Sequence, residues 1–463
     1  MWHITKRELY NNLNSLRFAL TTVLLLALMV TNAVRHIREH PKRVQKYHDA
    51  VTESVNRLTS HADSSLYTLA QKGPGDLYKK PSALNFCAEG AETLLPDRIN
   101  GGALGSSRFW SLRYPDANIN MMNVGPDVSQ VDWAFIIGYV LSLIALIFTF
   151  DAISSEREHG TLRLMLANAI PRQTVLIGKF LGALISITIP FMLAVLVNLL
   201  MLSTASAVYL NTQAWGRLGI ILFIALLYTC LFLALGLLVS ARVQRSAVSL
   251  VILLLTWVTV VVFMPSTLAA LARDFSSSMS RDEYWARYGQ SDHEFRRVNH
   301  VWARAKGLDD RTLRKRGEFF TTMAANNEHL HEGFLTFKVN QVQRARAITR
   351  ISPAVLLQHL LESFAGTGLE RHQQFIENVQ RYAREYREFV VDMDRGDPES
   401  RHIMGVREGM SQKPVNPEAV PRFEDTRNIG KDFNTAATKL LLLTLFVVVL
   451  LAGTYLAFVR VEI

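Results

Sequence analysis

Six long apolar blocks, separated by polar stretches of very unequal length, set the pattern of this chain of 463 residues. The blocks run over residues 18–34, 133–150, 175–202, 218–239, 247–271 and 436–459. Each is close to the roughly 20 residues with which a helix crosses a hydrocarbon core about 30 Å thick. Because the blocks are continuous rather than alternating, and because only helices and closed barrels satisfy their backbone groups in lipid, they predict transmembrane helices. A buried helix of a soluble protein would explain any one block, but not six in one chain.

The two longest polar stretches are residues 35–132 and 272–435. The first begins with a helical pattern and then becomes rich in Gly and Pro, which predicts a helix followed by irregular structure. The second contains amphipathic patterns over residues 281–305, 311–347 and 370–395, which predict helices. We therefore expect an all-α membrane protein of six transmembrane helices with a mainly helical extracytoplasmic domain.

Within the second polar stretch, Ser352-Pro353 is typical of a helix start, since Pro is well placed in the first turn. The surface that follows, over residues 355–361, is strongly apolar. It either packs inside the outer domain or rests on the outer leaflet of the membrane. Packing inside the domain is the expectation.

Residues 1–17 predict a cytoplasmic helix that lies on the inner leaflet before the first crossing. Trp2, Leu9, Leu13 and Leu16 fall on one helical stripe, and charged residues lie off it. Such an apolar stripe beside a basic face is typical of interfacial helices.

Lys and Arg in the short loops predict the orientation. They occur in residues 1–17, in the loop over 151–174, in the turn after the fourth block and in the C-terminal tail. With six crossings these four segments lie on one side, which is therefore cytoplasmic, as are both termini. The basic run within residues 35–46 belongs to a loop too long to count. A cleaved secretory signal over residues 18–33 is the alternative for the first block, and the arginines just after it disfavour that alternative.

The formal net charge of +10 fits positive-inside signals and contacts with anionic membrane lipid. No compact basic motif with interleaved aromatic residues occurs, so we expect no nucleic-acid partner. Cys87 lies in a long loop and Cys230 in the middle of the fourth block, and we expect no internal disulfide between them.

Several kinds of chemistry receive little support. Residues 328–332 read Glu-His-Leu-His-Glu, but two histidines two positions apart point to different faces of a helix, so a solvated surface is expected there rather than a metal site. No arrangement of nucleophile, base and orienting group is visible, so no catalytic residue is expected. The blocks carry no carboxylate at membrane depth, which disfavours an ion-driven carrier.

The loop between the second and third blocks is the most informative stretch. Ser155 and Glu158 fit a capping box, in which the Ser side chain holds a free backbone N–H and the Glu reaches back. Gly160 interrupts this helix, and Thr161 can cap a second one that Pro171 stops. The second helix presents an apolar face made of Leu162, Met165 and Leu166. We expect a short, rigid helix pair that docks another protein through this face and sets the register by its charges.

The sequence Glu-Arg-Glu-His-Gly-Thr-Leu at residues 156–162, with Pro171 after it and Gly178-Lys179 opening the next block, resembles the cytoplasmic loop of ABC-2 type export permeases. A less specific likeness runs from Ile351 to Phe375. It resembles the outer region of a subgroup with large loops after the first and fifth helices, related to gliding-motility and nitrous-oxide-reductase maturation permeases.

The resemblance implies the transmembrane permease subunit of an ATP-driven ABC exporter, multi-pass in the bacterial inner membrane. The chain has no Gly-x-x-x-x-Gly-Lys-Ser/Thr phosphate loop, so ATP and Mg²⁺ are expected on a separate cytoplasmic ATPase subunit, with no cofactor in this chain. The residues implied to couple to that ATPase are Glu156, Arg157, Glu158, His159, Gly160, Thr161, Leu162, Met165 and Leu166.

Such permeases work in pairs, so a second copy or a paralogue is expected, and the large outer segments suggest an extracytoplasmic partner. Two alternatives stay open at this point. The chain could instead be a membrane-anchored assembly or sensor protein, or it could transmit mechanical work to its outer partner without moving a substrate.

Overall fold

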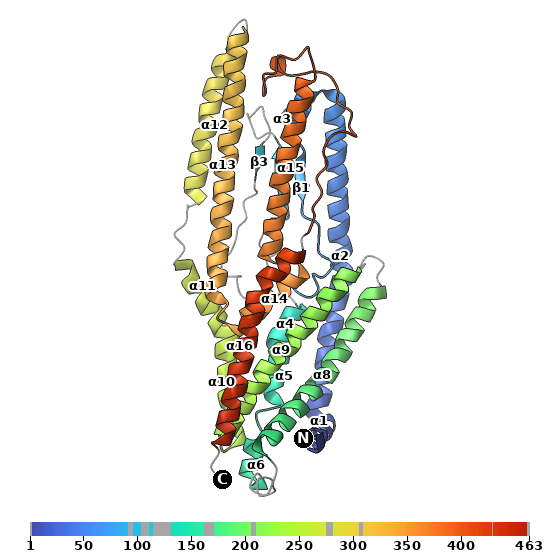
Figure 1. Ribbon diagram of the computed structural model, residues 1–463, viewed down its shortest axis with the longest axis vertical. Coiled ribbons are helices and arrows are strands. Elements are labelled where there is room, and N and C mark those ends of the chain that lie inside the picture. Colours follow the sequence, from blue (N-terminus) through green and yellow to red (C-terminus); the bar gives the residue numbers. More distant parts are fainter. Residues whose placement is uncertain are drawn as a thin grey trace.

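The computed structural model describes residues 2–90, 96–102, 111–113, 131–161, 171–204, 210–274, 281–304, 309–427 and 429–460. The molecule is elongated, with a helical bundle at one end and long helices that rise from it at the other (Figure 1). Both termini lie at the bundle end of the molecule (Figure 1).

Five helices of the described residues are long and apolar enough to cross a membrane. They lie in α2 (Leu16–Ser64), α8 (Arg172–Thr204), α9 (Thr212–Arg242), the stretch Ser246–Leu271, and α16 (Ile429–Val459). These five confirm five of the predicted blocks as long helices.

The second block, the one that remains, forms a shorter helix than the predicted 133–150. It consists of α4 (Trp133–Phe135), the π-helix η3 (Ile136–Leu141) and α5 (Ser142–Ile147), after which the chain turns. These 15 residues reach about 22 Å at 1.5 Å per residue, short of a 30 Å core. The count of six crossings therefore stays a prediction.

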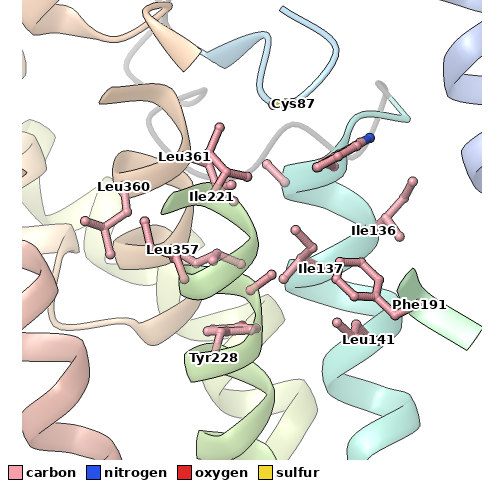
Figure 2. Close-up of a cluster of buried hydrophobic side chains, with 14 of the residues drawn as sticks. Cys87, Ile136, Ile137, Leu141, Phe191, Ile221, Tyr228, Leu357, Leu360 and Leu361 are labelled. Atoms are coloured by element: carbon pink, nitrogen blue, oxygen red, sulfur yellow. The ribbon is translucent and has the colours of Figure 1, made fainter. Parts of the chain in front are cut away.

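Helix α9 lies at the centre of the bundle, where it packs against α16, α5 and α14 (Pro353–Ala365). All residues of α14 from Ala354 to Ala365 are buried. Figure 2 shows Leu357 and Leu361 of α14 beside Ile221 of α9, near Ile137 of the short helix.

The predicted helix start at Ser352-Pro353 is thus confirmed, and so is core packing of its leucines. The core that they join, however, is continuous with the membrane helices and is not a separate outer core. An apolar helix that follows polar ones in sequence gives no sign of which other elements will cover it.

The fifth apolar block leads directly into the outer part. It consists of α10 (Ser246–Trp257), the π-helix η4 (Val258–Phe263) and α11 (Met264–Asp274), and α11 packs against α13 (Asp310–Thr349). Helix α12 (Arg281–Arg304) pairs with α13 as a long hairpin that stands beside the other outer elements (Figure 1). Phe295, Leu313, Phe320 and Met323 form its apolar seam, against which Ile403 and Val406 pack from the segment after the last outer helix.

The remaining outer part is built on α2, which continues without a break beyond its apolar stretch, and on α15 (Leu369–Arg395). Helices α12, α13 and α15 confirm the predicted helices over 281–305, 311–347 and 370–395 to within a few residues. The chain then passes the short 3₁₀ turn η5 (Arg407–Gly409) before it returns to the bundle in α16.

A small antiparallel sheet corrects the expectation that the first outer segment is irregular after its helix. After α3 (Leu66–Lys72), the strands β1 (Gly75–Tyr78), β2 (Arg98–Gly102) and β3 (Ser111–Arg113) pair in the order β1-β2-β3. Leu77 faces Ile99 across the first pair, and both side chains join the apolar core around α15. The strands are too short and too rich in Gly for their alternation to be visible in the sequence, and the pairing with this core decides their conformation.

Candidate ATPase-coupling site

The predicted coupling loop begins as helix α6 (Ser154–Glu158), at the end of the bundle where the termini lie (Figure 1). The backbone N–H groups of Ile153 and Ser154 both donate to the hydroxyl oxygen of Ser240, each at 3.0 Å. Ser240 is buried in the last turn of α9. The start of α6 is therefore fastened to α9.

The expected capping box is wrong. Ile153 holds the cap position of α6, and Ser155 and Glu158 lie inside the helix. The Ser240 hydroxyl takes over the role expected of Ser155, because it accepts from the amides at the helix start.

Lys179 lies at the centre of the site and joins three elements. Its side chain is 3% exposed, and its Nζ donates to Glu156 Oε1 of α6 and to Glu8 Oε1, each at 2.7 Å. Glu8 belongs to α1 (Trp2–Leu13), the N-terminal helix. A buried ammonium is costly unless oxygen atoms replace its water, and two carboxylates do so here. Glu156 is therefore held from within the chain.

Helix α1 approaches α8 closely at this point. A Cβ atom added to Gly182 would lie 2.7 Å from the Cβ atom of Glu8. Thr5 is buried on the same side of α1, whereas Trp2, Leu13 and Leu16 are exposed. Three residues of the predicted apolar stripe thus face outward, as an interfacial helix requires, whereas its fourth, Leu9, is half-buried.

Glu158 connects the loop to the fifth apolar block. Its Oε2 accepts from the backbone N–H of Ser246 at 3.2 Å and from the Ser246 hydroxyl at 2.9 Å. These two hydrogen bonds lower the pKa of Glu158, the bond from the backbone N–H being the larger cause. Because Ser246 is the first residue of α10, the carboxylate also lies at the positive end of that helix.

Two further contacts tie this end of the bundle together. Arg17 of α2 and Asp151, which precedes α6, form an ion pair with N–O 2.8 Å. Arg172 Nη1 at the start of α8 donates to the carbonyl of Val459, at the end of α16, at 2.6 Å.

The surface of the site is formed by the residues after α6. His159, Gly160 and Thr161 are exposed, and Arg157 is half-buried. Gly160 has φ +72°, a conformation that favours glycine, so the predicted interruption of the helix at this residue is confirmed. The predicted coupling residues Leu162, Met165 and Leu166 lie outside the described residues.

The structure thus places the two acidic residues of the motif in different internal contacts and leaves the following residues exposed. Sequence reasoning missed Glu8, Ser240 and Ser246. A charged Lys179 beside an otherwise apolar run was the available signal that a carboxylate must lie nearby, although nothing in the sequence pointed to α1 as its source.

The solvated surface expected at residues 328–332 is wrong for His331, which is buried, whereas His329 is exposed. Nδ1 of buried His331 is hydrogen-bonded to the hydroxyl of Tyr284, and Glu328 pairs with Arg387. Within the described part of the chain, no group of three His, Cys, Asp or Glu side chains is placed to hold a metal ion.

Comparison with known proteins gives two findings. The model of the ABC-2 family transporter proteins matches residues 2–463. The chain is also similar to a probable ABC transporter permease protein, NosY, of Pseudomonas aeruginosa, with 34% identity over 113 residues. This match covers 24% of the chain and 40% of the relative, so the chain spans less than half of the length of this curated relative.

Proposed function

Since the chain belongs to the ABC-2 family of transporter proteins, and is thus a multi-pass membrane permease component, we propose that it is the permease of an ATP-driven exporter. A separate cytoplasmic ATPase subunit binds ATP and Mg²⁺ and docks on the exposed residues after α6. The termini lie on the cytoplasmic side of the inner membrane, and a second permease copy or a paralogue completes the pair.

The observation that carries this proposal is the bridge that Lys179 makes between Glu156 and Glu8. A loop that merely connects two crossings needs no buried charge, whereas a loop that transmits a push must be rigid relative to the helices that it moves. Glu156 fixes α6 to α8 and α1, and Glu158 fixes it to α10. A displacement of His159 to Thr161 therefore reaches the start of the third and fifth apolar blocks together.

The test is a mild-detergent purification of the full chain from its native membrane, followed by identification of the proteins that come with it. We expect a stoichiometric soluble subunit that carries a Walker-type phosphate loop. The double variant Glu156→Gln/Glu158→Gln should recover that subunit about tenfold less, which corresponds to about 1.4 kcal/mol of binding free energy.

Glu53→Gln/Glu385→Gln is the matched control, since both of these exposed carboxylates form ion pairs within their own helices. If the ATPase is recovered equally with both double variants, the loop is not its docking site. If no ATPase accompanies the wild-type chain and an outer protein is recovered instead, the chain is an anchored assembly or sensor protein.

A second function is favoured by the length of the outer helices. Helix α2 has 49 residues and α13 has 40, and both extend far beyond the bundle (Figure 1). Such helices can carry a movement of the bundle to an extracytoplasmic partner, so the same ATP-driven motion can do mechanical work outside. Cross-linking from exposed outer positions with and without ATP distinguishes the two functions, because only mechanical transmission requires a bound outer protein.

A further inference from the structure

Two π-helical segments within the bundle are linked through one tryptophan. One is η3 in the short second helix and the other is η4 in the fifth apolar block. The residue that precedes η4, Trp257, donates its indole N–H to Ser142 Oγ at 2.9 Å, and its ring contacts Tyr139 of η3 edge-on. A π-helix widens the backbone and breaks the regular ladder, and such segments often occur where helices must move.

The sequence itself leaves one backbone carbonyl of η4 without a backbone donor in the π register. In a π-helix each N–H donates to the carbonyl five residues earlier, as Met264 does to Thr259. The next amide would be that of residue 265, which is Pro265 and has no N–H. The carbonyl of Val260 therefore lacks the donor that the π register would supply.

Helix α14 supplies that donor. The hydroxyl of Ser352, the residue before the helix, donates to the carbonyl oxygen of Val260 at 3.3 Å. Ser352 is fully buried, and within the described residues its side chain makes no capping bond to α14. A Ser at this position normally caps its own helix, so the hydroxyl is used here for a contact between two elements.

The other π-segment has a similar arrangement. The carbonyl of Gly138 accepts from the hydroxyls of Ser142, at 2.6 Å, and Tyr228, at 3.2 Å. A Cβ on Gly138 would lie 3.6 Å from a methyl group of Leu357, so α14 also rests on η3. Helix α14 thus contacts both irregular segments at once.

We propose that η4 is a hinge between α10 and α11, and that the Ser352 hydroxyl is the latch that holds it. This inference rests on the proposed function, because α6 is fastened to the start of α10 while α11 packs on the outer hairpin. When the loop moves, the bond from Ser352 to Val260 breaks and α11 turns with α12 and α13 relative to α10. Ser142 and Trp257 keep the two π-segments in register during this movement.

The first test needs no ATPase. Hydrogen–deuterium exchange is measured on the full chain in lipid nanodiscs, for peptides that cover residues 258–266. Loss of the latch in Ser352→Ala should raise the exchange of this segment by about 2- to 10-fold, the range expected for one hydrogen bond. Ser266→Ala is the matched control, because its exposed hydroxyl donates, among the described residues, only to Val262 one turn earlier. Equal exchange in both variants would overturn the latch.

The second test uses the complex with its ATPase in a Cys87→Ala/Cys230→Ala background. Spin labels at two exposed residues, His48→Cys on α2 and His300→Cys on α12, report the distance between the outer helices. ATP should shift this distance in the wild type and in Ser266→Ala. Ser352→Ala should lose at least about half of the shift while its ATPase rate stays within about twofold.

The two hypotheses fail differently. If Ser352→Ala moves as far as the wild type, the hinge is overturned and the exporter proposal stands. If the wild type hydrolyses ATP without any change of distance, the coupling proposed for the loop fails, and the exchange experiment still decides the latch.

Pro265→Ala gives a second variant, since it restores an N–H for Val260 and should slow the exchange of the same segment.

Discussion

Lys179 brings together two carboxylates from different parts of the chain. Its ammonium is almost fully buried, whereas the Glu8 and Glu156 side chains are 26% and 28% exposed. The buried ammonium has lost its water, so its burial costs a large free energy unless both carboxylates bind it. The carboxylates are still partly hydrated and therefore depend less on the ammonium. The interaction is therefore unequal, and the three residues respond differently to substitution.

Lys179→Met should lower the free energy of unfolding by roughly 1–3 kcal/mol, less than for a fully buried pair because water reaches both carboxylates. The triple variant Glu8→Gln/Glu156→Gln/Lys179→Met should recover at least half of that loss, since it leaves no uncompensated charge. Chemical denaturation in detergent measures the free energy of unfolding of both variants. A triple variant less stable than Lys179→Met would contradict this account.

Asp132, at the start of the short second helix, is the residue from which we expect a pH dependence. Its carboxylate accepts from the backbone N–H groups of Phe135 at 2.8 Å and Glu89 at 3.0 Å. Burial raises its pKa from 3.8 to about 7, although these two bonds act in the opposite direction. The folded chain therefore binds this proton more tightly than the unfolded chain does.

Because the folded pKa is the higher one, stability from this group should rise as the pH falls from about 7 toward 4. Asp132→Asn keeps an acceptor for the Phe135 amide and cannot titrate. Between pH 7.5 and 5.5 we expect the wild type to gain stability relative to the variant. Thermal denaturation at both pH values measures this difference, and parallel curves would show that Asp132 does not titrate in this range.

At the scale of elements, the bundle depends on close helix contacts that only small residues allow. Gly182 lets α1 lie against α8, whereas a Cβ on Gly219 of α9 would meet nothing within 4 Å. The two glycines lie in helices of similar length and apolarity, so they form a matched pair for the same substitution.

Gly182→Val should force α1 away from α8 and lower the free energy of unfolding by roughly 1–3 kcal/mol, the usual cost of overpacking. Gly219→Val should change it little, because its side chain enters open space. The comparison is made by thermal denaturation of both purified variants. Similar losses in the two would indicate a general helix effect rather than the contact with α1.

The elements also show what the sequence predicts and what it leaves open. Long apolar runs, the Ser352-Pro353 start and the break at Gly160 were all predictable, because each depends on a local property of the chain. The π-segments were not, since a uniformly apolar run looks the same in either register. Pro265 was a visible signal, but its meaning depends on a hydroxyl almost 90 residues away in sequence.

The candidate site was predictable to a similar extent. The motif at residues 156–162 located the loop, but not the partners of its acidic residues. Those partners come from α8 and α10, and only the tertiary structure brings them to the loop. The capping box failed for the same reason, because a buried hydroxyl from another helix replaced a local one.

At the scale of the whole molecule, the bundle end and the far end should lie in different compartments. His159 follows α6 and His300 lies near the end of α12, and both are exposed. Helix α6 lies at one end of the molecule, and the hairpin of α12 and α13 reaches the other (Figure 1). If the Lys and Arg of the short loops fix the orientation, a membrane-impermeant thiol reagent added on one side reaches only one of these two positions.

In a Cys87→Ala/Cys230→Ala background, His300→Cys should react in intact spheroplasts, and His159→Cys should react only after the membrane is opened. The expected difference is at least about tenfold in labelling, because the bilayer excludes the reagent. Labelling of His159→Cys from outside would reverse the orientation.

The unbroken course of α2 has a mechanical consequence. From Arg35 to its end at Ser64 the helix continues for about 45 Å, at 1.5 Å per residue, beyond its apolar part. A helix of that length amplifies rotation at its base, so a tilt of about 10° within the membrane, carried along the helix, moves the tip by about 8 Å. Small changes of angle in the bilayer thus become, at the far end of this protein, displacements as large as a side chain.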